Sequence, residues 1–127
     1  SDYIAVSGGI AWSVATLMHP EMVDNSVIAV SFDDVIKFSE KLYNNHPAFS
    51  DLAIAKTLQV NNPDKAAIVK SVKTVNTVFD QRSLMAGTGL LLKIMRQFVS
   101  ATETKQFYLI KNGQVGWISA YVDQEVD

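Results

Sequence analysis

The C-terminal segment from Lys105 to Val122 constrains the fold more strongly than any other part of the sequence. Within KQFYLIKNGQVGWISAYV, two runs rich in β-branched and aromatic residues flank Asn112 and Gly113. An Asn-Gly pair readily adopts the two positive φ angles of the tight turn that joins antiparallel strands. The segment therefore predicts a β-hairpin. Because both alternating faces of each run carry apolar side chains, we expect the hairpin to lie within a larger sheet.

Helical patterns dominate the middle of the chain. Apolar residues at helical spacing, together with polar capping residues, predict four helices over residues 31–43, 50–60, 63–79 and 84–100. The last of these is apolar around most of its circumference, so we expect it to be central or to lie in a subunit interface. A short β-branched run at residues 27–30 predicts a strand before the first helix.

The N-terminal residues 3–18 fit two structures. Residues 3–6 are strand-like, and Gly8 and Gly9 then break the pattern. Large and small side chains alternate over residues 10–18, and we expect a second strand there, after a glycine turn. A helix remains open as the alternative, because three large residues would share one of its faces: Ile10, Val14 and Leu17.

Taken together, these patterns predict the α+β class. We expect about four helices packed on an antiparallel sheet that includes the C-terminal hairpin, in a single domain formed by residues 1–127. The chain contains no cysteine, which excludes disulfides, thiolate metal sites and a cysteine nucleophile. No run is apolar enough for a membrane span, and no basic region precedes the N-terminal apolar run, so we expect a cytoplasmic protein.

A pair of closely spaced glycines in residues 85–93, Met-Ala-Gly-Thr-Gly-Leu-Leu-Leu-Lys, raises the question of a phosphate-binding loop. Such loops follow a strand, and their motifs need either four residues between the glycines or a third glycine three residues later. This segment has neither spacing and follows a predicted helix. We therefore interpret Gly87-Thr88-Gly89 as a close-packing point or a kink, and we expect no cofactor.

Nucleic-acid binding is the first alternative function. Residues 51–105 carry a net charge of +4, between segments of −4 and −2. Residues 50–79 predict two helices joined by a short turn, as in a helix-turn-helix motif. The motif would present four lysines: Lys56, Lys65, Lys70 and Lys73. The predicted recognition helix lacks arginine and glutamine, the usual readers of bases, so we consider this function less favoured than protein binding.

Catalytic and metal sites find little support. His19 and His46 each precede a proline and have no second ligand at a close spacing, so no metal site is expected. Asp33 and Asp34 lie in the first turn of a predicted helix, where acids stabilise the helix dipole without any catalytic role. A small enzyme with remote carboxylates and histidines is the second alternative, and a lined cavity near Asp33 or His46 would favour it.

Aromatic residues suggest the function that we favour. If exposed, those of the predicted sheet would form a surface for a protein partner or a small apolar ligand: Trp12, Tyr108, Trp117 and Tyr121. Combined with the apolar last helix and the absence of a catalytic set, this predicts a small non-enzymatic interaction module that forms a homodimer.

Overall fold

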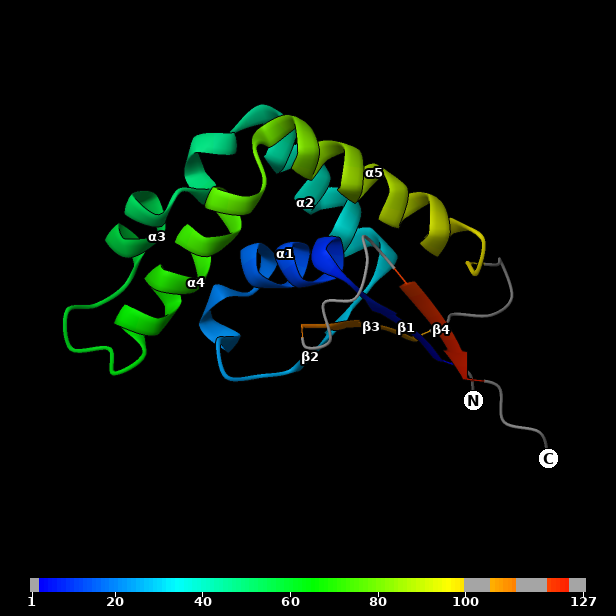
Figure 1. The fold of residues 1–127 in the computed structure, drawn as a ribbon, viewed down its shortest axis with the longest axis horizontal. Helices are drawn as coiled ribbons and strands as arrows, with labels where there is room; N and C mark the ends of the chain where they lie inside the picture. The colour runs from blue at the N-terminus through cyan, green and yellow to red at the C-terminus, as the bar shows by residue number, and fades with distance from the viewer. Residues whose placement is uncertain (1–2, 100–105, 112–118, 124–127) are drawn as a thin grey trace.

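The computed structural model describes residues 3–99, 106–111 and 119–123, which form five α-helices and a four-stranded sheet (Figure 1). The predicted α+β class is therefore confirmed. Along the chain the elements are β1 (Tyr3–Ser7), α1 (Gly9–Met18), the 3₁₀ helix η1 (Pro20–Met22), β2 (Val27–Val30), α2 (Phe32–Asn44), the 3₁₀ helix η2 (His46–Phe49), α3 (Asp51–Thr57), α4 (Lys65–Val78), α5 (Gln81–Arg96), β3 (Gln106–Ile110) and β4 (Ser119–Asp123).

The sheet is mixed rather than antiparallel throughout, because of where its first strand lies. Its strand order is β2-β3-β1-β4; β1 runs parallel to β3 and antiparallel to β4, and β2 runs antiparallel to β3. Both strands of the expected C-terminal hairpin exist, but β1 lies between them, so they do not pair with each other. Ile4 and Val6 of β1 are fully buried, and the central position gives this strand hydrogen-bonding neighbours on both sides. The expected turn at Asn112-Gly113 lies outside the described residues.

Residues 9–18 form helix α1, so the expected strand is wrong and the helical alternative is correct. Gly8 enters the helix with a φ of 109°, a backbone conformation that favours glycine. The helix lies between the sheet and helices α4 and α5 (Figure 1). Large and small residues on different sides are therefore buried together, which obscured the helical period: Ile10, Ala11, Ser13, Val14, Ala15, Thr16 and Leu17.

Helix α5 begins three residues before the predicted start because Asp80 caps it. The Asp80 carboxylate accepts a hydrogen bond of 2.8 Å from the backbone N–H of Ser83. The helix continues without a break through both glycines, and the buried hydroxyl of Thr88 donates to the Leu84 carbonyl at 2.7 Å.

The two glycines of α5 differ in their surroundings. A Cβ atom added at Gly87 would lie 2.5 Å from Cγ1 of Ile10 in α1, whereas one added at Gly89 would meet nothing within 4 Å. Gly87 is therefore the close-packing point that the sequence predicted, while Gly89 faces away from the neighbouring helices.

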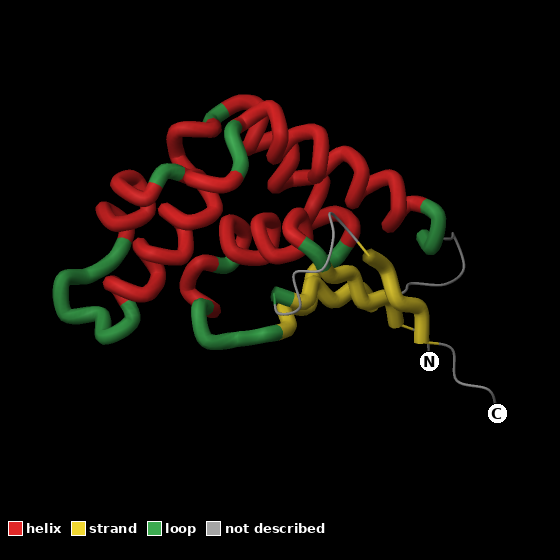
Figure 2. Tube along the Cα trace, viewed as in Figure 1, coloured by secondary structure: helices red, strands yellow, loops and turns green. Residues whose placement is uncertain are grey.

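The other helices agree with the predicted segments, although α3 ends earlier than expected, at Thr57. Helix α2 begins with a capping box, in which the Ser31 hydroxyl accepts from the Asp34 N–H at 3.0 Å and the Asp34 carboxylate accepts from the Ser31 N–H at 3.2 Å. The helices gather on one side of the sheet, and α3 with the start of α4 extends away from it (Figure 2). Among the described residues, no helix combines the length and the apolar character needed to cross a bilayer.

Candidate interaction surface

The strands divide their side chains between a covered and an open face of the sheet. Six residues that face the helices are buried in the core: Ile4, Val6, Ile28, Val30, Phe107 and Leu109. Because successive residues of a strand point to opposite faces, the residues between them face the other side. Figure 2 shows the helices packed on one side of the sheet, so that none of the described helices covers the second face.

The open face contains a shallow apolar depression of about 380 Å³. Residues of β1, β2 and β3 line it: Tyr3, Ala5, Val27, Tyr108 and Ile110. Tyr3 and Val27 are 41% and 48% exposed, which is high for large apolar side chains on a sheet. None of the five described residues that line the depression is charged. We call these five residues the sheet-face patch.

The two tyrosines of the sheet-face patch contact each other. Their rings meet edge to face, with centroids 5.7 Å apart and planes at 85°, a favourable geometry for an aromatic pair. Tyr108 lies opposite Ala5 in the parallel register of β1 and β3. The pair fixes the two ring orientations, so the patch presents a preformed rather than an adaptable surface.

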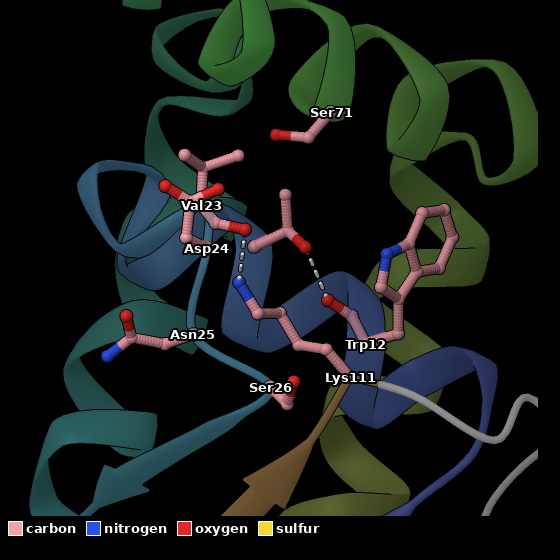
Figure 3. Close-up of a pocket in the computed structure, with 8 residues that line it drawn as sticks. Trp12, Val23, Asp24, Asn25, Ser26, Ser71 and Lys111 are labelled. Carbon is pink, nitrogen blue, oxygen red and sulfur yellow. Dashed lines mark hydrogen bonds between the residues drawn. The ribbon is translucent and has the colours of Figure 1, made fainter. Parts of the chain in front are cut away.

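The structure separates the aromatic residues that the sequence grouped together. Tyr108 belongs to the sheet-face patch, and Tyr121 lies opposite Ala5 in the register of β1 and β4. Trp12 is on α1 and lines a different pocket, close to Lys111 (Figure 3). Trp117 lies outside the described residues. Three members of the patch were not predicted from the sequence: Tyr3, Val27 and Ile110. Their alternation with the buried strand residues indicates that they share the open face of the sheet.

The apolar last helix supports an interface less strongly than expected. Helix α5 buries one side, and the rest of its circumference includes exposed positions such as Ala86, Gly89 and Leu90. Leu90 is 37% exposed, so most of even this residue is covered by the rest of the chain. The apolar excess of α5 is thus used mostly inside the chain, against α1 and α2.

The predicted nucleic-acid segment forms helices α3 and α4, but their connection occupies residues 58–64, longer than the three or four residues of a helix-turn-helix turn. Lys56, Lys70 and Lys73 are exposed, while the Lys65 ammonium lies 3.4 Å from the Leu58 carbonyl within the connection. The lysines thus lie in solvent, and the two helices lack the short turn that positions a recognition helix. Nucleic-acid binding therefore remains the less favoured prediction.

A groove beside α2 is where the enzyme alternative would have to lie. It has a volume of about 310 Å³ and brings His19 and Asp34 near two lysines and an apolar floor. Each of these four side chains has a local contact: the Ser31 hydrogen bonds lower the pKa of Asp34, His19 lies 3.4 Å from Glu21, Lys37 lies 2.9 Å from Asp33, and the Lys41 ammonium lies 5.1 Å from the centre of the Phe49 ring. The groove therefore brings together no nucleophile and base.

The described residues contain no group of three or more histidine, aspartate or glutamate side chains that could hold a metal ion. His46, the other histidine considered, has a buried Nε2 atom without a hydrogen-bond partner in the described part of the chain. Comparison of the chain with family models, curated proteins and solved structures found no match.

Proposed function

We propose that this chain is a non-enzymatic interaction module that forms a homodimer through the sheet-face patch. The observation that carries the proposal is the patch itself, an uncharged and partly exposed apolar surface on the one side of the sheet that lacks helices. Two such faces can pack against each other about 10 Å apart, as the sheets of a β-sandwich do.

A second copy of the chain suits this surface because a two-fold interface uses the same patch on both subunits. An uncharged patch creates no like-charge repulsion when it meets itself, whereas a patch with one sign of charge would. The edge-to-face pair of Tyr3 and Tyr108 adds rigid aromatic area, which loses little side-chain entropy on burial.

The dimension of the sheet sets the expected strength of the dimer. The three strands that carry the sheet-face patch have four or five residues each; spaced by about 4.8 Å and rising by about 3.3 Å per residue, they present roughly 200 Å² of projected area. A standard stable interface buries about 800 Å² on each partner. We therefore expect a weak dimer that dissociates on dilution rather than an obligate one.

Sedimentation analysis over a range of protein concentrations tests the proposal. The wild-type chain should show a reversible monomer–dimer equilibrium, and Val27→Lys should shift it to monomer because association would bury an unpaired ammonium group of each subunit in an apolar interface. The matched control is Val60→Lys, since Val60 is 93% exposed and lies outside the patch in the α3–α4 connection.

Three results would contradict the proposal: a wild-type chain that stays monomeric at every concentration, a dimer that Val27→Lys leaves intact, or equal loss of dimer in the Val60→Lys control. Circular dichroism of each variant establishes that the helices are retained, so that loss of the dimer can be separated from loss of the fold.

A further inference from the structure

A third pocket lies apart from both the sheet-face patch and the groove beside α2. It has a volume of about 250 Å³, the space of about eight water molecules at ~30 Å³ each. Its walls come from α1, the segment between η1 and β2, helix α4 and the end of β3 (Figure 3). Two of the described lining residues, Trp12 and Val23, are largely apolar. The other six are polar: Thr16, Asp24, Asn25, Ser26, Ser71 and Lys111.

Lys111 holds one wall of the pocket in place. Its ammonium donates to the Met22 carbonyl at 2.7 Å and reaches the Val23 carbonyl at 3.5 Å, and its backbone N–H donates to the Ser26 carbonyl at 2.8 Å. Burial lowers the pKa of Lys111, and the carboxylates of Asp24 and Glu21 oppose this shift. Among the described residues that line the pocket, Lys111 is the only cation and Asp24 the only anion, so these residues together carry no net formal charge.

Two hydroxyl groups of the pocket are oriented by hydrogen bonds within their own helices. Thr16 donates to the Trp12 carbonyl at 2.7 Å, and Ser71 donates to the Ile68 carbonyl at 2.9 Å. A hydroxyl that donates its proton in this way still has oxygen lone pairs that can accept. Together with the Asp24 carboxylate, these hydroxyl oxygens give the pocket several acceptors. The Lys111 ammonium has three N–H donors, and the Met22 and Val23 carbonyls use two of them, which leaves one for a ligand.

Trp12 supplies the remaining wall. Figure 3 shows its indole at one side of the pocket, with the ring nitrogen toward Lys111 and Asp24. An indole offers an apolar face and a single N–H donor. The pocket thus combines an aromatic wall with a balanced set of donors and acceptors and no net charge.

We infer that this pocket binds a small, neutral, polyhydroxylated ring, such as a hexose. Each hydroxyl of a sugar both donates and accepts, which matches the mixed polar groups from α1, α4 and β3. The edge of the Trp12 indole that is turned toward Lys111 and Asp24 carries the ring N–H, which adds a donor for one of these hydroxyls. A phosphate or other strong anion fits poorly, because Asp24 lies in the same wall and the Lys111 ammonium already donates to main-chain carbonyls.

Ligand-observed saturation-transfer NMR tests the inference, with glucose, galactose and mannose as separate probes and inorganic phosphate as the anionic comparison. At least one hexose should give a saturable signal, and phosphate should not compete with it. Ser71→Ala should weaken binding about fivefold, the effect of losing one hydrogen bond. Trp12→Leu should abolish binding by removing the aromatic wall.

The variants are chosen so that folding and binding can be separated. Trp12 packs against the core, so its replacement can affect the fold, whereas the Ser71 hydroxyl bonds only within α4. Lys73→Ala is the matched control, an exposed position two residues farther along α4 that does not line the pocket. Absence of a hexose signal, competition by phosphate, or binding that survives Ser71→Ala unchanged would overturn the inference.

Discussion

The contact between α1 and α5 and the contact between α3 and α4 show two opposite ways of pairing helices. In the first, Gly87 removes a side chain where Ile10 approaches, so that Ile10 is fully buried. In the second, α3 has no fully buried residue, and Leu52 and Val60 are 72% and 93% exposed. Both regions are rich in apolar residues. Apolar content alone therefore does not decide which helices become core.

This difference has an energetic consequence. Opening of a protein is local, and regions with few buried apolar contacts open at a lower free energy than the core. We therefore expect the α1–α5 contact to unfold only with the whole molecule, while α3 and the connection to α4 fluctuate more readily. The predictions below test this contrast by altering one side of it at a time.

Replacement of Gly87 by leucine should have the largest effect. Even a single Cβ at this position would collide with Ile10, and overpacking of a core costs about 1–3 kcal/mol or more. We expect Gly87→Leu to lower the free energy of unfolding by about 3 kcal/mol or to prevent folding, as measured by urea denaturation. The Gly87→Ala and Ile10→Ala pair checks the cause: the double variant should be less destabilised than the sum of the two single variants.

Replacement of Gly89 by alanine should have a smaller effect of the opposite sign. Nothing lies within 4 Å of a Cβ added there, and alanine is favoured over glycine in a helix interior by about 1 kcal/mol. Gly89→Ala should therefore raise the free energy of unfolding by ~1 kcal/mol in the same experiment. Destabilisation by Gly89→Ala would show that the surroundings of the two glycines do not differ as described.

The smallest effect is expected at the exposed end of the molecule. Val60→Ser changes a side chain that is 93% exposed, and such surface substitutions usually alter stability by less than ~0.5 kcal/mol. Thermal denaturation should show nearly the same midpoint for this variant and the wild type. A large loss of stability would mean that the α3–α4 connection is held by contacts as specific as those of α1 and α5.

The sequence predicted the helices better than the sheet, for reasons that particular residues show. Ser31 and Ser50 cap α2 and α3 where the sequence predicted helix starts, whereas Asp80, the cap of α5, was assigned to a break and the start of that helix was predicted three residues too late. Helix α1 was misassigned because it is buried on several sides, which removes the one-sided pattern. The pairing of β1 with β3 was not predictable, since nothing near Tyr3 indicates that its partner is residue 106.

The candidate surface and pocket were only partly predictable for the same reason. Tyr108 was singled out for its aromatic ring, but its neighbours Tyr3 and Val27 join it only through the strand order of the sheet. Trp12 was placed with the sheet aromatics because residues 10–18 were expected to be a strand. Once they form a helix, Trp12 lies beside Lys111 instead.

The central position of β1 also determines when its contacts in the sheet can form during synthesis. Residues 3–7 are synthesised before both strands that flank them, residues 106–110 and 119–123, which follow about a hundred residues later in the chain. Contacts between segments so far apart in the sequence form slowly, and a strand without its partners is prone to aggregation. Until those two strands are synthesised, β1 has no sheet partner among the described strands, and Ile4 and Val6 can pack only against helices such as α1.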